Sequence, residues 1–191
     1  MVFCQFVVGA PGSGKSTYCH GMQQFMRAIG REAVLVNLDP ANEDLQYSCA
    51  VNITDLITVE DAMKAYGLGP NGALMYCMSW LDENMDLLKQ ALAPHEGKYI
   101  LFDFPGQAEL YTHNSHMRSI VDQIKKWDYL PVVVNLLDSH LCTSFGNHFG
   151  VKINCSMYDC RLSFSQFLCR LFSHCSHLLQ VQILRISLLE L

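Results

Sequence analysis

The stretch Gly9–Ser16 holds the residues whose types and spacing point most directly to chemistry. It reads GAPGSGKS and fits the pattern G-x-x-x-x-G-K-[ST]. Glycines in such a loop let successive backbone N–H groups curl inward toward phosphate oxygens. Lys15 would place its ammonium on the β- and γ-phosphates, and Ser16 would offer its hydroxyl to Mg²⁺. The stretch, called the phosphate loop below, therefore predicts a site for a nucleoside di- or triphosphate with Mg²⁺.

The flanks of the phosphate loop match those that the pattern requires. The apolar run Val2–Val8 predicts a buried strand before it, and Ser16–Ile29 has the spacing of an amphipathic helix that ends at Gly30. The start of that helix would add its positive dipole end to the phosphate site. We expect the loop and the first helical turn to supply the phosphate contacts, from Gly9, Gly12, Ser13, Gly14, Lys15, Ser16 and Thr17.

A carboxylate and a possible water-orienting group follow a later strand. Asp103 ends the apolar run that starts at Tyr99, and Phe104-Pro105-Gly106-Gln107 follows. At a strand end facing the phosphate loop, Asp103 would hold Mg²⁺ through a water, and the Gly106 N–H would approach the γ-phosphate. Gln107 or Glu109 would orient an attacking water. The alternative for Asp103 is an N-cap of the helix that follows.

Asp39 is a second acidic residue placed after a predicted strand, Ala33–Leu38. With Ser16 and Asp103 it completes the candidate metal set, and it could also polarise the nucleophile; its alternative is a solvated turn. Catalysis would consist of positioning and charge stabilisation, without a covalent enzyme intermediate. No arginine is an obvious transition-state ligand, because Arg118 is expected on a solvated helix face.

The remaining elements alternate between strands and helices. Thr58 and Asp61 form a capping pattern for a helix that Gly67 ends, and a loop over Gly69–Gly72 follows. Leu130–Leu137 reads as a nearly all-apolar strand. Such alternation predicts an α/β fold of the P-loop NTPase type, with a mostly parallel sheet covered by helices on both faces. After the loop, apolar residues at alternating steps of four and three predict one long helix. This apolar stripe would pack either in the core or against a partner helix. It consists of Leu74, Met78, Leu81, Met85, Leu88 and Leu92.

The composition of the chain argues against several classes of function. The chain has 191 residues, of which 50% are hydrophobic, and a net charge of −5. That acidity argues against a nucleic-acid partner bound through a basic face. Charges interrupt every long apolar run, and the N-terminus lacks the basic region of a signal peptide, so neither a membrane partner nor secretion is expected. The nine scattered cysteines favour free thiols in a reducing, cytoplasmic setting over a zinc site among the tail cysteines.

The chain changes character near Ser144. Residues 1–143 carry nine Lys/Arg and sixteen Asp/Glu, a balance of −7, whereas residues 144–191 carry +2. We therefore divide the chain into a partial P-loop core, 1–143, and a tail, 144–191, that is divergent in composition. A sheet incomplete on its C-terminal side would leave Leu130–Leu137 near an open edge. Apolar residues of the tail, with a helical pattern over Phe164–Phe172, would be available to cover it.

The chain contains, in this order, Gly9–Ser16, Asp39–Glu43, Gly69–Asn71 and Asp103–Gln107. Together these four segments resemble the GPN-loop GTPase family, and the similarity reaches as far as Thr143. The resemblance implies dimeric GTPases that bind GTP or GDP with Mg²⁺, as homodimers or with paralogues. It also implies that Asn71 of one subunit reaches the phosphates in the other, in place of an arginine. It further implies a link to RNA polymerase II assembly and nuclear import, and a cytoplasmic protein that shuttles to the nucleus.

One family motif is not found in this chain. Members continue after the fourth strand with [NST]-K-x-D, whose aspartate pairs with guanine, but the only lysine after Lys126 is Lys152, followed by Ile153-Asn154. The sequence therefore shows no motif that would select guanine. A pocket that hydrogen-bonds the base is what discriminates strongly between one base and another. Two alternatives to a GTPase stay open: a P-loop kinase for a small acceptor, and a catalytically weak dimer subunit or isoform.

Overall fold

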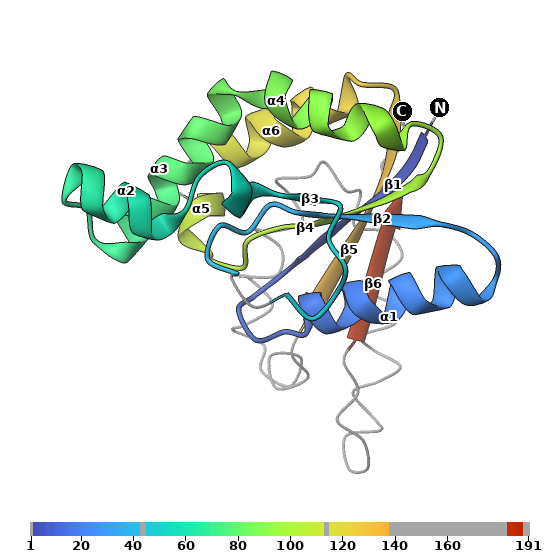
Figure 1. The fold of residues 1–191 in the computed structure, drawn as a ribbon. Coiled ribbons are helices and arrows are strands. Elements are labelled where there is room, and N and C mark those ends of the chain that lie inside the picture. The colour runs from blue at the N-terminus through green and yellow to red at the C-terminus, as the bar shows by residue number, and fades with distance from the viewer. Residues whose placement is uncertain (1, 43–44, 113–114, 138–182, 189–191) are drawn as a thin grey trace, which may run out of the picture.

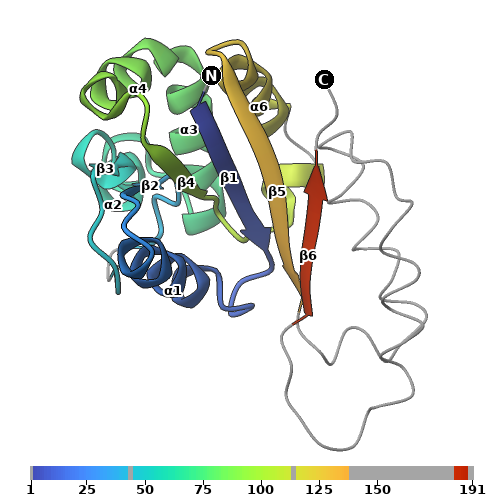
Figure 2. The same cartoon turned by 90° about the vertical axis from the view of Figure 1, so that its right-hand side faces the viewer.

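A six-stranded sheet forms the centre of the computed structural model, which describes residues 2–42, 45–112, 115–137 and 183–188. The strand order is β3-β2-β4-β1-β5-β6, as Figure 2 shows. Every neighbouring pair is parallel except β5 and β6, which run antiparallel. The expected α/β fold with a mostly parallel sheet is confirmed. The strands are β1 (Val2–Gly9), β2 (Ala33–Asn37), β3 (Val51–Asn52), β4 (Tyr99–Asp103), β5 (Tyr129–Leu137) and β6 (Ile183–Leu188).

Helices cover both faces of the sheet, as Figure 1 shows. Helix α1 lies on one face against β1, β2 and β4, whereas α3, α4 and α6 lie on the other. None of the helices in the described part of the chain is both long and apolar enough to cross a membrane. The helices are α1 (Lys15–Ala28), α2 (Val59–Tyr66), α3 (Pro70–Glu83), α4 (Met85–Leu92), α5 (Glu109–Thr112) and α6 (His116–Lys125), with short 3-10 turns η1 (Ile53–Asp55) and η2 (Ala93–His95).

Alternation along the strands divides the core into two clusters. Phe6 and Phe102 point to the side of α3, α4 and α6, where their rings meet edge to face with centroids 5.5 Å apart. Val7 and Leu101, one residue along each strand, point to the side of α1 and pack near Cys19. Because both faces are covered, the central strands are apolar at successive positions, as parallel strands usually are.

The helix ends confirm several sequence predictions. Gly30 follows α1 with a φ of +74°, and Gly67 ends α2 with a φ of +62°, both in the left-handed region that glycine adopts without strain. The Thr58 hydroxyl oxygen accepts the Asp61 N–H at 3.1 Å and so caps α2. The Asp61 carboxylate accepts the Thr58 hydroxyl proton at 2.7 Å, which holds the cap in place.

The predicted long helix is interrupted at Asn84 and forms two helices, α3 and α4. The backbone leaves the helical range at Asn84, which has φ −116° and ψ +31°. The Trp80 carbonyl accepts both the Asn84 main-chain N–H at 3.1 Å and the Asn84 side-chain N–H at 2.7 Å, so the side chain holds this turn at the end of α3. The apolar stripe from Leu74 to Leu92 is nevertheless buried on both helices. Its role is core packing, and the alternative of a partner surface is wrong.

The start of α3 differs from the predicted loop. Pro70 is the first residue of the helix, so Asn71 and Gly72 stand in its first turn rather than in a loop. Proline is favourable at that position because its fixed φ suits the helix and its missing N–H is not needed there. The Gly-Pro-Asn run is therefore a helix N-terminus.

The predicted open edge beside β5 is paired in this structure. Residues 183–188 of the tail form β6, whose Ile186 lies opposite Val134 of β5. The predicted helix at Phe164–Phe172 and the tail cysteines lie outside the described residues, as does Cys142. Among the described cysteines, all are free thiols, and Cys4, Cys19 and Cys77 are buried as expected.

Candidate functional site

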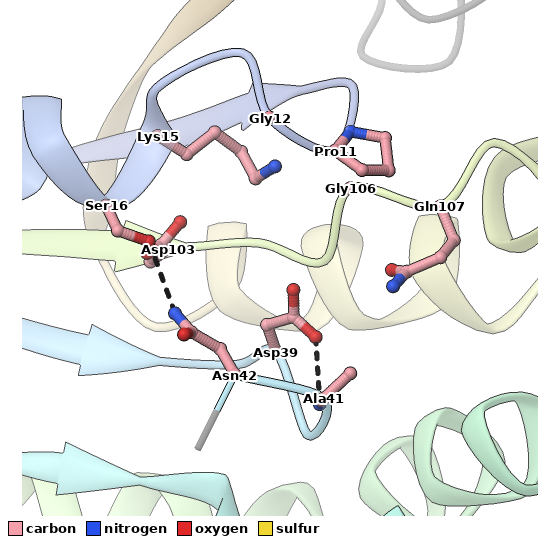
Figure 3. Close-up of a pocket in the computed structure, with 10 residues that line it drawn as sticks. All are labelled: Pro11, Gly12, Lys15, Ser16, Asp39, Ala41, Asn42, Asp103, Gly106 and Gln107. Atoms are coloured by element: carbon pink, nitrogen blue, oxygen red, sulfur yellow. Dashed lines mark hydrogen bonds between the residues drawn. The ribbon is translucent and has the colours of Figure 1, made fainter. Parts of the chain in front are cut away.

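A pocket of about 220 Å³ opens where β1, β2 and β4 end at the same edge of the sheet. Open parallel sheets bind ligands at this edge. Figure 3 shows that the loops after these three strands approach one another there. The pocket is lined by Pro11, Gly12, Lys15, Ser16, Asp39, Ala41, Asn42, Asp103, Gly106 and Gln107.

The phosphate loop takes the curled form that its glycines predict. Gly12 and Gly14 have φ angles of +76° and +89°, which L side chains rarely adopt, and Gly14 stands immediately before α1. Gly9 is required for space, because a Cβ there would lie 2.5 Å from the Leu136 carbonyl oxygen. Ser13 is buried, with its hydroxyl oxygen enclosed in the loop.

Lys15 lies within the phosphate loop. Its Nζ donates to the Gly9 and Ala10 carbonyl oxygens, each at 3.1 Å. Burial lowers the pKa of Lys15, and the nearby carboxylates of Asp103 and Asp39 partly offset that shift. The site therefore combines one buried cation with two acidic side chains.

Asp103 lies at the end of β4 with only 2% of its surface exposed. Its Oδ2 accepts the Tyr47 hydroxyl at 2.8 Å and the Ser16 hydroxyl at 3.3 Å. Its Oδ1 is buried and accepts no hydrogen bond within the described part of the chain. Burial raises the pKa of Asp103 to about 6, although Tyr47 and Lys15 both favour the ionised form. The alternative role of helix N-cap does not fit, because α5 starts only at Glu109.

Asp39 follows β2 and lies on the opposite side of the pocket from the phosphate loop (Figure 3). The Ala41 N–H donates to its Oδ1 at 3.0 Å, and its own N–H donates to Asn37 Oδ1 at 3.1 Å. Asn37 is fully buried and also donates to Asn52 Oδ1 at 2.9 Å, which ties the turn to β3. Burial raises the pKa of Asp39, partly offset by the Ala41 amide and Lys15.

Gly106 and Gln107 close the pocket from the side of β4. A Cβ on Gly106 would lie 2.5 Å from Lys15 Nζ and 2.9 Å from the Pro11 nitrogen, so only glycine fits against the phosphate loop. The Gln107 side chain lines the pocket (Figure 3), and its Oε1 is a buried acceptor without a hydrogen bond among the described residues. A carboxamide in this place can bind a polar ligand atom.

Six predicted site residues do not line the pocket. Gly9, Ser13 and Gly14 belong to the phosphate loop itself, whereas Glu109, Thr17 and Asn71 lie outside it. Glu109 is exposed on α5, two residues beyond Gln107, and Thr17 is exposed on α1. Asn71 is exposed in the first turn of α3. Within this single chain, the structure brings Lys15, Ser16 and the two aspartates together but does not bring these three residues to them.

Two polar side chains at the site were missed by reasoning from the sequence, as were the lining residues Pro11 and Ala41. Asn42 lines the pocket, and its side-chain N–H donates to Ser16 Oγ at 3.2 Å (Figure 3). Tyr47 contacts Asp103 from the connection between β2 and β3. Asn42 could have been noticed from its place three residues after Asp39, but Tyr47 carries no sequence signal beyond being an aromatic residue near a strand.

The donor set fits Mg²⁺. The Ser16 hydroxyl and the two carboxylates are oxygen ligands, and the unbonded buried Oδ1 of Asp103 is an acceptor suited to a metal-bound water. The described residues include no group of three or more His, Cys, Asp and Glu side chains that could hold a metal. Mg²⁺ usually takes one or two carboxylates and substrate phosphates, so a sparse set of this kind is what it needs.

The comparisons with known proteins agree with this geometry. A family model described as "Conserved hypothetical ATP binding protein" matches residues 7–184. GPN-loop GTPase 2 of Danio rerio is 52% identical over 140 residues, 73% of this chain and 45% of that protein. GPN-loop GTPase QQT1 of Arabidopsis thaliana is 51% identical over 150 residues, 78% of this chain and 50% of that protein. The chain thus spans about half the length of these curated relatives.

The fold also matches a solved structure, that of a GTPase in apo form from Pyrococcus abyssi. The TM-score is 0.55, the match covers 94% of this chain and 86% of that chain, and the identity is 19%, so the likeness concerns the fold. The family match covers nearly the whole chain, and these two relatives are about 50% identical to it over 73% and 78% of its length. The chain therefore belongs to the GPN-loop GTPase family.

Proposed function

We propose that this chain binds GTP with Mg²⁺ and hydrolyses it, acting as a switch of the GPN-loop type. The observation that carries the proposal is the hydrogen bond of 3.3 Å between Ser16 Oγ and Asp103 Oδ2, beside the buried ammonium of Lys15. It joins the two oxygen ligands of the candidate metal site at the mouth of the phosphate loop. In P-loop NTPases such a hydroxyl and such a carboxylate hold Mg²⁺, which neutralises charge on the phosphates.

The reaction would be an in-line displacement at the γ-phosphorus. A water oxygen forms the new bond to phosphorus, the bond to the β–γ bridging oxygen breaks, and GDP and inorganic phosphate result. Lys15 and the phosphate-loop amides would stabilise the negative charge. Gln107, whose Oε1 has no protein partner among the described residues, would orient the water, and Asp39 is a second candidate for polarising it.

The base that the site prefers is part of the proposal. The relatives are named GTPases, whereas the family description names ATP, and the chain contains no [NST]-K-x-D motif. We propose GTP on the strength of the relatives. Because polar groups that recognise a base discriminate strongly, parallel titration with GTP, ATP and GDP decides this point. Equal weak affinity for all three would favour the weak-subunit alternative.

We further propose that the chain works as a homodimer or with a GPN-loop paralogue, and that Asn71 contacts the partner's nucleotide. The exposed position of Asn71 at the start of α3 supports this proposal. Two tyrosines are in contact, one on α2 and one on α3, the helix whose first turn holds Asn71. Tyr66 is 58% exposed, its ring centroid lies 4.5 Å from that of Tyr76, and the two ring planes are tilted by 44°. Exposed aromatic residues are typical of interfaces.

The cellular role proposed from the family resemblance is assembly and nuclear import of RNA polymerase II. Its subunits or assembly factors would be the partners, and the chain would be cytoplasmic with shuttling to the nucleus. The net charge of −5 supports protein partners rather than direct contact with nucleic acid. Co-purification with tagged polymerase subunits, compared with and without GTP, tests this role.

The activity is tested by phosphate release from GTP with and without Mg²⁺. Lys15→Ala removes a charged donor to the phosphates, so we expect nucleotide affinity to fall about 10- to 100-fold. Lys98→Ala is the matched control, because Lys98 pairs with Glu32 at 2.6 Å and does not line the pocket. Unchanged release by Lys15→Ala would contradict the proposal. Phosphate found on an added acceptor rather than in water would instead indicate a kinase.

A further inference from the structure

Tyr47 is a buried residue that reaches the site from the connection between β2 and β3. It is 6% exposed, and its ring packs in the cluster on the α1 side of the sheet, which includes Cys19 and Leu35. The same connection carries Asp39 and Asn42, both of which line the pocket. Tyr47 therefore lies on the same connection as Asp39 and Asn42, while its hydroxyl contacts Asp103 at the end of β4.

The two carboxylate oxygens of Asp103 differ in their hydrogen bonds. Oδ2 accepts both hydroxyl protons, from Tyr47 at 2.8 Å and from Ser16 at 3.3 Å. Oδ1 accepts none from the described residues, although it is buried. A carboxylate held by one oxygen has a fixed orientation about its terminal bond, so the second oxygen presents its lone pairs in a fixed direction. Buried acceptors without a partner are rare, which marks Oδ1 as the place for a ligand atom.

We propose that Tyr47 is a positioning residue that fixes Asp103 so that its Oδ1 receives a metal-bound water. The proposal rests on the function proposed above, because it assumes that Mg²⁺ enters with the nucleotide. Tyr47 touches neither metal nor nucleotide in this role and acts only through Asp103. Groups that orient a metal's ligands typically account for 10- to 100-fold in metal affinity. Since Tyr47, Asp39 and Asn42 share one connection, the hydrogen bond also links that connection to β4.

The test is the Mg²⁺ affinity of the full chain loaded with a fluorescent GDP analogue. Tyr47→Phe removes one oxygen and keeps the ring, so we expect about 10-fold or greater weakening of Mg²⁺ binding. Affinity for the analogue in excess EDTA should stay within about twofold, because phosphate contacts are unaffected. Tyr18→Phe is the matched control. Tyr18 lies beside the same cluster, and its hydroxyl donates to Gln5 Oε1 at 2.9 Å, so its loss should leave Mg²⁺ binding unchanged.

A double-mutant comparison separates positioning from general damage. If Tyr47 acts through Asp103, adding Tyr47→Phe to Asp103→Asn should cause no further loss of Mg²⁺ affinity, whereas independent losses would add. The Asp103→Asn background also keeps the test valid if Tyr47→Phe alone folds poorly, because it removes the buried charge. Equal Mg²⁺ affinity in wild type and Tyr47→Phe would overturn this inference alone. A wild-type chain with no Mg²⁺-dependent nucleotide binding would overturn the proposed function as well.

Discussion

Asp103 is a buried side chain whose ionised form destabilises the folded protein, and it is also a central residue of the candidate site. Its carboxylate is almost fully buried, with Lys15 near it and two hydroxyls bound to one oxygen. Burial of a charged group opposes ionisation, and the surrounding donors only partly offset that penalty. The protein thus maintains a destabilising carboxylate at the mouth of the phosphate loop, which is typical of functional sites.

The pH dependence of stability follows from this carboxylate. Its pKa in the folded chain is about 6, above the ordinary value of 3.8, so between these pH values the folded chain holds a proton that the unfolded chain has released. Folding stability that Asp103 confers when protonated is therefore lost as pH rises toward 6 and above. In EDTA, we expect Asp103→Asn to gain stability relative to wild type over pH 4–7, by about 1–3 kcal/mol.

Urea unfolding of both chains at several pH values measures this difference. The free energies of unfolding should diverge as pH rises and run parallel above about pH 7, where the folded carboxyl is fully ionised. A difference that stays constant from pH 4 to 7 would show that Asp103 ionises normally.

Gly106 is a residue at which the space between the phosphate loop and the β4 loop admits only a hydrogen atom. A methyl group there would meet Lys15 Nζ and the Pro11 nitrogen at 2.5 and 2.9 Å, so the phosphate loop and the β4 loop would have to separate. We expect Gly106→Ala to weaken nucleotide binding about 10-fold, in line with overpacking costs of about 1–3 kcal/mol.

Calorimetric titration with GDP measures the effect of Gly106→Ala, with Gly21→Ala as the matched control. Gly21 lies in α1, and a Cβ on it would meet nothing within 4 Å. Because alanine favours a helix over glycine, Gly21→Ala should raise stability by up to about 1 kcal/mol and leave affinity unchanged. Normal affinity in Gly106→Ala would mean that the two loops already stand apart in solution.

At the scale of elements, the cap of α2 is the clearest case in which local sequence decides structure. Thr58 Oγ1 accepts the Asp61 N–H, and Gly67 ends the helix eight residues after it begins. We expect Thr58→Ala to lower the free energy of unfolding by about 1 kcal/mol, because one amide of the first turn loses its acceptor.

Thermal unfolding measures this loss, and Thr58→Ser serves as the control because serine caps as well as threonine. A midpoint for Thr58→Ser close to that of wild type would assign the effect to the hydroxyl. Equal destabilisation by both substitutions would assign it to the lost methyl group instead.

Elements with strong local patterns were predictable, and those decided by competition were not. The strands around Phe6, Leu35 and Leu101 are apolar runs ended by glycine or aspartate, and each appears as expected. The break at Asn84 was missed, because an apolar stripe does not show where a single residue leaves the helical range of φ and ψ. Strand β3 has two residues and is held by pairing with β2, so no periodicity could show it.

The same distinction applies to the site. Lys15, Ser16 and Asp103 were predicted from the sequence. The first two belong to the phosphate-loop motif, and the third ends an apolar run that predicts a strand. Tyr47 was not, because its hydrogen bond to Asp103 joins residues 56 positions apart and depends on how the chain returns after β2. Contacts between residues that are far apart in the chain produce no regular spacing in the sequence, so they could not be predicted from it.

At the scale of the whole molecule, the prediction concerns catalysis shared between two chains. If Asn71 serves the partner's site, Lys15→Ala and Asn71→Ala should each be inactive alone yet recover activity when mixed. Random exchange makes half of the dimers mixed, each with one intact site, so we expect about one quarter of the wild-type rate of phosphate release.

Mixing each variant with itself is the control, and analytical ultracentrifugation establishes that dimers form and exchange. Recovery well above both separate variants supports sharing. Dimers that exchange without any recovery would show that Asn71 does not act across the interface.

The antiparallel pairing of β6 has a consequence for how this fold tolerates change. Leu137, where β5 ends, lies directly opposite Ile183, where β6 begins, at the edge of the sheet that carries the phosphate loop. Both anchors of the intervening stretch are thus neighbours, and the entropy of closing such an excursion grows only slowly with its length. Insertions, deletions or wholesale replacement between these anchors would leave the sheet and the residues of the phosphate loop in register.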